Sequence, residues 1–251
     1  MKFFLALVFL IIIFSCSKSE SYPWLNTLDS ETKYEESGKR LMSLDFGLNP
    51  LESFNKNEKV IFIGVHGSRS LGYEWIYPLQ TLDTEMTATF FYRWDDKRCY
   101  LNSAEKLFFH LSKTIKDYPS LKKIILIGHS YGGVLVTSMV EAWNHDILLE
   151  IHSIAGPIGS SFSRGGCNYD PPQDISSRVV FYQWRTQHHL DTAFSRLKED
   201  PQILNLERSK ITRLPETYRG RRLGHNWSIS WVADQLRSQN NLKQKIQTNK
   251  N

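Results

Sequence analysis

The sequence is sparing in cysteine, proline and glycine, and it lacks internal repeats and long blocks of like charge. With 14 glycines and 9 prolines in 251 residues, a collagen-like or low-complexity chain is excluded. The longest apolar run covers residues 3–14. A bilayer-spanning helix needs about 20 residues, so this run is too short for an ordinary transmembrane anchor.

What is present indicates a folded domain. Hydrophobic residues make up 41% of the chain against 23% charged, which is enough apolar mass for a full core. The 31 basic and 26 acidic side chains leave a net charge of +5. This mild excess could favour an anionic membrane surface or substrate, but it is far from the signature of a nucleic-acid-binding protein. We therefore expect no nucleic-acid partner.

The N-terminus is typical of an export signal. Lys2 precedes the apolar run, as in a secretory signal peptide. Four residues at its end resemble the lipobox of bacterial lipoproteins: Ile13, Phe14, Ser15 and Cys16. Phe14 departs from the small residue usual at its position. The resemblance implies that Cys16 becomes a lipidated N-terminus, while the alternative is an ordinary cleaved signal peptide with an incidental cysteine. Both alternatives predict export.

These features predict four segments along the chain. Residues 1–15 are expected to be a signal peptide, and residues 16–30 a lipidated N-terminus and polar tether that holds the protein at a membrane of the bacterial envelope. Residues 31–240 are expected to form one domain, and residues 241–251 a polar tail. An oxidising compartment would permit Cys99 and Cys167 to pair, but the sequence leaves that pairing open.

Strands and helices alternate after residue 58. Apolar or β-branched runs predict strands at residues 59–65, 87–94, 122–127, 148–155, 178–184 and 210–213. Helical periodicity predicts helices from a cap at Asn102 or Ser103 to Pro119, over residues 134–143, and over residues 227–236. The alternation predicts an α/β fold with a mostly parallel sheet covered by helices on both faces.

The strongest chemical signal lies between the strand at 122–127 and the helix at 134–143. Residues 128–133 read Gly-His-Ser-Tyr-Gly-Gly and match G-x-S-x-G. A strand before and a helix after this motif are the context of a strained turn that holds a serine above the sheet. Gly128 and Gly132 permit the tight backbone approach. Ser130 is therefore the candidate nucleophile.

Together these motifs resemble the α/β-hydrolase family, in particular its lipases and esterases. The likeness covers residues 59–236, with His66-Gly67-Ser68 resembling the family's oxyanion loop. It implies an α/β-hydrolase fold with a minimal cap, because only about twenty residues separate the strands at 148–155 and 178–184. It also implies that the backbone N–H groups of Ser68 and Tyr131 stabilise the oxyanion.

The family's chain order requires an acid and then a histidine after the serine. His225 lies between the last short strand and the final helix and is the candidate base, with His188 and His189 as rivals that could instead bind a metal. Asp191 follows the strand at 178–184 and is the candidate acid, although it could simply cap a helix. The alternative acids are Asp170 and Asp174.

The expected activity is hydrolysis of a small-molecule or lipid ester through a Ser130–Asp191–His225 triad and an acyl-enzyme, without a metal or organic cofactor, and thioester or amide substrates are alternatives. Because a long lid is not expected, the site should be open. Two alternative interpretations remain open. The chain could be a catalytically inactive fold that acts as a surface binding module, or a purely structural envelope lipoprotein. The sequence fixes neither the acyl chain length nor the oligomeric state.

Overall fold

A computed structural model describes residues 24–53 and 58–248, with side chains up to residue 239. Its centre is a seven-stranded sheet in the order β1-β3-β2-β4-β5-β8-β9, in which only the edge strand β1 is antiparallel to its neighbour. The strands are β1 (Gly47–Pro50), β2 (Val60–Val65), β3 (Thr87–Arg93), β4 (Lys123–His129), β5 (Leu148–Ile154), β8 (Val179–Arg185) and β9 (Lys210–Arg213). The predicted α/β class with a mostly parallel sheet is confirmed.

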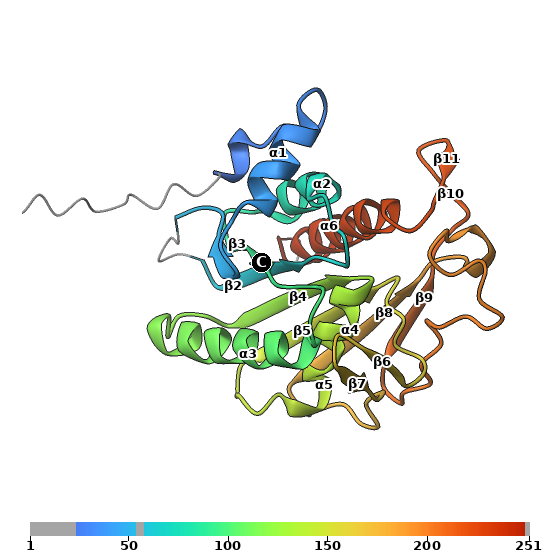
Figure 1. Ribbon diagram of the computed structural model, residues 1–251. Coiled ribbons are helices and arrows are strands. Elements are labelled where there is room, and N and C mark those ends of the chain that lie inside the picture. The colour runs from blue at the N-terminus through green and yellow to red at the C-terminus, as the bar shows by residue number, and fades with distance from the viewer. Residues whose placement is uncertain (1–23, 54–57, 249–251) are drawn as a thin grey trace, which may run out of the picture.

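Helices cover both faces of this sheet (Figure 1). One layer contains α1 (Tyr34–Met42), α2 (Tyr73–Leu82) and α6 (Trp227–Thr248), and the other contains α3 (Tyr100–Asp117), α4 (Tyr131–Thr137) and α5 (Met139–Ala142). Strand β2 shows why both faces need cover. Ile61 and Ile63 lie in the core beneath α3 and α4, while Phe62 lies in the core beneath α2 and α6. Because successive side chains point to opposite faces, an apolar strand needs a helix on each side.

Several boundaries differ from the predicted ones. Helix α3 begins at Tyr100, with Cys99 as its N-cap residue, so neither Asn102 nor Ser103 caps it. The helix expected at residues 134–143 is two helices that meet at Ser138. Helix α6 continues to Thr248, so the segment expected as a polar tail is helical in backbone over residues 241–248.

The domain also begins earlier than predicted. Residues 24–30 were expected to belong to a tether, but Leu25 and Leu28 are buried in the core beneath α1 and α2. The Leu25 N–H donates to the Leu51 carbonyl at 3.0 Å, and Gln80 Nε2 donates to the carbonyl oxygens of both leucines. The predicted signal peptide and Cys16 lie outside the described residues.

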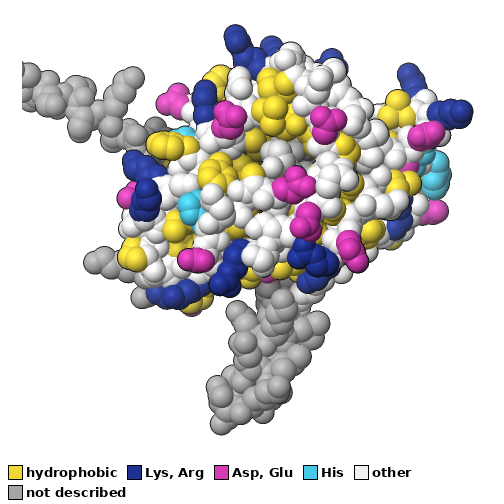
Figure 2. All heavy atoms as spheres, turned by 90° about the horizontal axis from the view of Figure 1, so that it is seen from below, with side chains coloured by type: hydrophobic (Ala, Val, Ile, Leu, Met, Phe, Trp, Pro, Cys, Tyr) yellow, Lys and Arg dark blue, Asp and Glu magenta, His cyan; other side chains and the backbone are white. Residues whose placement is uncertain are grey.

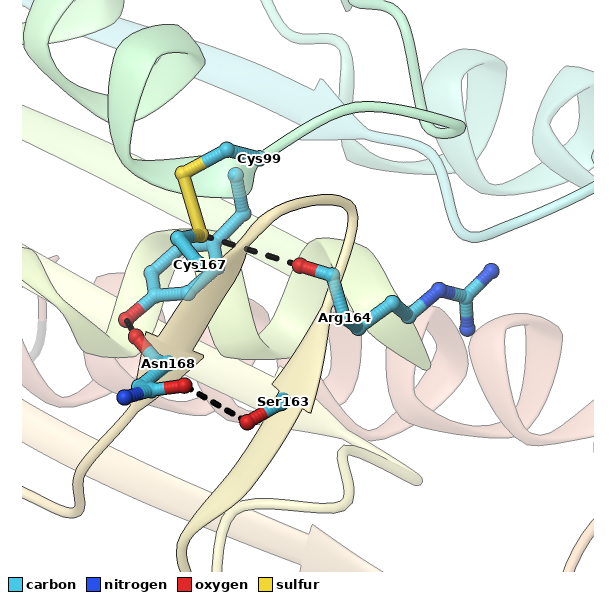
Figure 3. Close-up of a disulfide and its surroundings, with 6 residues drawn as sticks. Cys99, Ser163, Arg164, Cys167 and Asn168 are labelled. Carbon is cyan, nitrogen blue, oxygen red and sulfur yellow. Dashed lines mark hydrogen bonds between the residues drawn. A yellow bond between two sulfur atoms is a disulfide. The ribbon is translucent and has the colours of Figure 1, made fainter.

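Two short hairpins project from the sheet connections, β6 (Phe162–Arg164) with β7 (Cys167–Tyr169), and β10 (Thr217–Tyr218) with β11 (Arg221–Arg222). A disulfide between Cys99 and Cys167 joins the first hairpin to the start of α3, which resolves the pairing that the sequence left open (Figure 3). The connection between β5 and β8, which was expected to lack a long lid, therefore carries a small hairpin held by a disulfide.

The surface has mixed charge. Figure 2 views the side that lies lowermost in Figure 1 and shows Lys and Arg side chains interspersed with Asp and Glu side chains. Within residues 24–53 and 58–248, no helix combines the length and apolar character that crossing a bilayer requires.

Candidate active site

Ser130 sits at the turn between β4 and α4, and the backbone there is strained. Its φ is 53°, a conformation that a non-glycine residue rarely adopts outside a constrained turn. The Ser130 N–H donates to the Ile154 carbonyl at 2.8 Å, which ties the turn to the neighbouring strand β5. A Cβ at Gly132 would collide with the Val65 and His66 carbonyl oxygens. Close backbone packing therefore holds Ser130 at the carboxyl edge of the sheet.

His225 lies in the loop before α6 and lines the same cavity as Ser130, a space of about 90 Å³. Its Nδ1 lies 2.9 Å from Asp191 Oδ2, and 13% of its side chain is exposed. Because the carboxylate accepts the Nδ1 proton, the other ring nitrogen carries the lone pair. The structure thus brings Ser130, Asp191 and His225 to one edge of the sheet from three separate segments.

Asp191 is fully buried at the end of a 3-10 turn (His188–Leu190) that follows β8. Its Oδ2 accepts from His225 and from the Thr186 hydroxyl, and its Oδ1 accepts from the Ala193 N–H at 2.9 Å. Residues 192–196 form a turn and not a helix, so Asp191 is not the helix cap that the sequence offered as an alternative to catalysis. Asp191 instead stabilises this turn through the Ala193 N–H and also holds the histidine ring.

His129, next to the nucleophile, packs against His225 with 4.6 Å between ring centroids. Burial, with the nearby His225 adding to it, lowers the pKa of His129 well below its usual value. His129 is therefore neutral, and its Nε2–H donates to the His225 carbonyl oxygen at 3.1 Å. A neutral neighbour supports the His225 loop without repelling an imidazolium that forms there.

The loop after β2 brings Ser68 beside the nucleophile. A Cβ at Gly67 would lie 3.0 Å from the Ser130 Cβ, so this backbone passes directly over Ser130. Ser68 lines the cavity with Ser130 and His225. Tyr131 is the first residue of α4, where an N–H has no acceptor within the helix. Both residues that the sequence predicts as oxyanion donors thus adjoin Ser130, Ser68 in the lining of the same cavity and Tyr131 as the next residue in the chain.

His66 links this loop to β3. Burial lowers the pKa of His66 to about 4, so the ring is neutral. Its Nδ1–H donates to the Gly67 carbonyl oxygen at 2.8 Å, and its Nε2 accepts from the Trp94 N–H at 3.2 Å and from Arg93 at 3.1 Å. The ring therefore fixes the loop after β2 against the end of β3.

The alternative acids and bases lie elsewhere. Asp174 is exposed and pairs with Arg208 at 2.6 Å, and Asp170 is also exposed. Neither they nor His188 and His189 line the cavity that contains Ser130. Among the residues that the structure describes, no group of three or more His, Cys, Asp or Glu side chains is placed to hold a metal ion.

Sequence reasoning missed two polar residues beside the site. Asp96 follows β3 and accepts from the Ser68 hydroxyl at 3.0 Å, and Arg164 on the β6–β7 hairpin also donates to that hydroxyl. Neither residue belongs to a local motif. The one signal in the sequence was the possible pairing of Cys99 with Cys167, because Asp96 and Arg164 each lie three residues before one of these cysteines.

Comparisons with known proteins support the fold. No family model and no curated protein matches the sequence. Among solved structures, Est1E from Butyrivibrio proteoclasticus is similar with a TM-score of 0.51 and 12% identity, over 76% of this chain and 90% of that one. A thioesterase candidate from Silicibacter sp. TM1040 has a TM-score of 0.51 and 14% identity, over 88% of this chain and 91% of that one. The architecture is the α/β-hydrolase fold.

Proposed function

We propose that this protein is a serine hydrolase that cleaves carboxylic esters through Ser130, Asp191 and His225. One observation carries the proposal: a fully buried carboxylate holds the ring of His225 in the cavity that Ser130 enters from a strained strand-to-helix turn. A hydroxyl is a weak nucleophile until a base takes its proton, and this arrangement supplies that base.

In the proposed first half-reaction, the unprotonated Nε2 of His225 takes the proton of Ser130 as the serine oxygen bonds to the acyl carbon. Asp191 holds the ring orientation and stabilises the imidazolium. The imidazolium then gives its proton to the departing alkoxide, which leaves as an alcohol and yields an acyl-enzyme. In the second half-reaction, His225 takes a proton from water as the water oxygen bonds to the acyl carbon. The bond from the acyl carbon to the Ser130 oxygen then breaks, and the imidazolium returns its proton to that oxygen, which releases the acid and restores the Ser130 hydroxyl.

The oxyanion formed in each half-reaction needs donors fixed in advance. The backbone N–H groups of Ser68 and Tyr131 are the proposed donors, since both residues adjoin Ser130, one in the loop after β2 and one at the first position of α4. Each such donor is typically worth about 3 kcal/mol of transition-state stabilisation.

A fluorophosphonate probe tests the nucleophile. The full-length chain should be labelled at Ser130, and Ser130→Ala should abolish the labelling and the hydrolysis of p-nitrophenyl esters. Ser138→Ala is the matched control, because Ser138 lies at the junction of α4 and α5 and its hydroxyl donates to the Leu135 carbonyl oxygen in α4. Labelling that persists in Ser130→Ala would overturn the assignment.

A series of p-nitrophenyl esters of increasing chain length tests the substrate class. A preference for short chains would mark an esterase, and a preference for long chains or dispersed substrate would mark a lipase. If no ester is turned over and the probe stays silent, the hydrolase proposal fails, and the fold is better explained as a binding module.

We also propose that the protein is exported and anchored through a lipid on Cys16. The short apolar run and the lipobox-like residues support this, and so does the Cys99–Cys167 disulfide, because disulfides persist mainly in oxidising compartments. Metabolic labelling with an alkynyl fatty acid should mark the wild-type chain and spare Cys16→Ala. A wild-type protein that is cleaved but unlabelled would indicate an ordinary signal peptide.

A further inference from the structure

We infer that Arg164 is a positioning residue for the oxyanion loop, acting through the side chain of Ser68, and that the Cys99–Cys167 disulfide holds it in place. This inference rests on the proposed function, because it concerns the backbone N–H that would stabilise the oxyanion. Arg164 touches no reacting atom in this proposal. Its role is to hold the donor where the charge develops.

The hydroxyl of Ser68 is held from two sides. It donates to Asp96 Oδ2 at 3.0 Å, and it accepts from Arg164 Nη2. The same carboxylate oxygen accepts the N–H of the next residue, Arg69, at 2.9 Å. The loop is thus fixed by a side-chain and a main-chain hydrogen bond to Asp96 and by a charged donor from Arg164. A hydroxyl with both its donor and an acceptor position engaged cannot rotate without losing a bond.

Arg164 also contacts the second proposed oxyanion residue. Its guanidinium lies over the ring of Tyr131, with 4.2 Å from Cζ to the ring centroid. A cation over an aromatic face is attracted by the ring quadrupole, and a guanidinium can stack and donate hydrogen bonds at the same time. One side chain therefore spans Ser68 and Tyr131, whose N–H groups would share the oxyanion.

Arg164 has little else to engage it. Among the ion pairs of the described residues, none includes Arg164, and the residue is exposed. A long exposed arginine without a carboxylate partner would ordinarily sample many rotamers. The position of its guanidinium therefore depends on the hairpin that carries it.

That hairpin is fixed to the body of the protein at its base and tip. Cys167 is bonded to Cys99, and a Cβ at Gly165 would collide with the Arg98 carbonyl oxygen, so the tip packs directly on that backbone. Figure 3 shows the disulfide at the hairpin and the Arg164 side chain extending away from it. Tyr169 is buried and donates to the Ile158 carbonyl oxygen at 3.1 Å. These contacts hold the Arg164 backbone in one place.

The same disulfide lies close to both of the groups that hold Ser68. Asp96 precedes Cys99 by three residues, and Arg164 precedes Cys167 by three residues. The bond therefore joins the segment that supplies the carboxylate to the segment that supplies the guanidinium. Breaking it would release the hairpin and loosen the loop on the Arg164 side.

A double-mutant cycle on the full-length chain tests this coupling, with the best p-nitrophenyl ester as substrate. Arg164→Gln should lower kcat about 10-fold with little change in KM, because a small displacement of a catalytic group costs rate more than ground-state binding. Ser68→Ala keeps the backbone N–H but removes the hydroxyl, and it should have a similar effect. In the Ser68→Ala background, Arg164→Gln should cause no further loss.

Three variants sharpen the test. Arg164→Lys keeps a charged donor and should recover part of the lost rate. Cys99→Ser combined with Cys167→Ser should lower kcat like Arg164→Gln, and if this variant does not fold, the Arg164 cycle decides alone. The matched control is Arg98→Gln, because the Arg98 side chain is 83% exposed and pairs only with Asp95. It should leave kcat unchanged.

A tetrahedral mimic supplies a second readout. An aryl trifluoromethyl ketone forms an oxyanion on the serine, and its affinity should fall in Arg164→Gln by the same factor as kcat/KM. An unchanged kcat in Arg164→Gln would overturn the inference. So would an Arg164→Gln loss that persists in Ser68→Ala, since Arg164 would then act by a route other than the Ser68 side chain. In both cases the proposed hydrolase would stand, because that proposal is tested by Ser130→Ala.

Discussion

At the scale of single residues, one buried carboxylate accepts hydrogen bonds from three groups. Asp191 Oδ1 holds a backbone N–H, which any amide oxygen could do, while Oδ2 accepts from the Thr186 hydroxyl and holds the imidazole of His225. The bond to His225 is the one that needs a carboxylate, because an amide can turn its NH₂ toward Nδ1 and favour the wrong tautomer of the ring. Local structure and catalysis can therefore be separated by a single isosteric change.

Asp191→Asn should lower kcat for ester hydrolysis about 10³- to 10⁴-fold while leaving thermal unfolding within a few degrees of wild type. The amide keeps the hydrogen bond from the Ala193 N–H, so folding survives, but the ring of His225 is no longer held in its reactive form. Steady-state kinetics and circular dichroism measure the two effects. Asp174→Asn is the control. If Asp191→Asn keeps more than a tenth of the wild-type kcat, then the residue only stabilises the turn.

The neutral His66 predicts an acid-sensitive contribution to stability. Its pKa is about 4 in the folded protein, against 6.5 for an unperturbed side chain, because the ring is buried. Between these pH values the unfolded chain binds a proton that the folded chain does not. The free energy of unfolding should therefore fall as pH drops through this window, by about 3 kcal/mol from this group, and the contribution should then level off below pH 4.

Urea unfolding of wild type and His66→Gln from pH 7 to pH 4 isolates the contribution of His66 to the free energy of unfolding. The comparison is needed because Glu52 acts in the opposite direction. Burial raises the pKa of Glu52 from 4.5 to about 7, so this carboxyl group makes the free energy of unfolding fall as pH rises from 4.5 to 7. The variant should show a shallower loss on acidification than wild type. Parallel curves would mean that His66 titrates alike in both states.

Sequence reasoning found the residues whose role is indicated by their immediate neighbours in the chain. Ser130 was predicted from six adjacent positions with a strand before and a helix after, and His225 from its place before the last helix. Arg164 and Asp96 were not predicted, because they meet at Ser68 from segments separated by 68 positions along the chain. Nothing in either local segment specifies that contact, which arises from the hairpin geometry and the disulfide.

At the scale of elements, the central strands were predictable because they are buried on both faces, whereas helix α2 and the edge strand β1 were not predicted. Strands β2 and β4 are largely apolar runs because helices cover both sides. Helix α2 was not predicted because Pro78 lies inside it, and a proline within a helical pattern normally ends or kinks the helix. Strand β1 is a four-residue edge that contains a proline, a composition that argues against a strand.

The turn between β4 and α4 predicts a sharp intolerance to a methyl group. Gly132→Ala should destabilise the protein by about 3 kcal/mol and remove esterase activity, because the new Cβ would collide with backbone oxygens that cannot move without disrupting β2. Gly220→Ala is the control: its Cβ would meet no atom within 4 Å, and only its φ of +73° adds strain, at about 1 kcal/mol. Equal losses in the two variants, measured by urea unfolding, would contradict the close packing of this turn.

At the scale of the whole molecule, the disulfide raises the question of what it stabilises. A chain of this size has a sufficient core without disulfides, since apolar clusters lie on both faces of the sheet. The Cys99–Cys167 disulfide is therefore better explained by the segment that it positions than by a contribution to global stability. It fastens a hairpin beside the cavity of Ser130, where a displacement of an ångström would affect turnover more than folding.

The limits of the folded unit yield the last prediction. If residues 16–30 were only a tether, a chain starting at residue 31 would be as stable as one starting at residue 24. Leu25 and Leu28 are 5% and 4% exposed, and burying a leucine contributes about 2 kcal/mol, so the shorter chain should lose about 4 kcal/mol in urea unfolding. Gln80 would also lose both carbonyl acceptors. Leu25→Ala with Leu28→Ala in the longer chain should reproduce most of this loss, whereas an equal stability of the two truncated chains would restore the tether to residue 30.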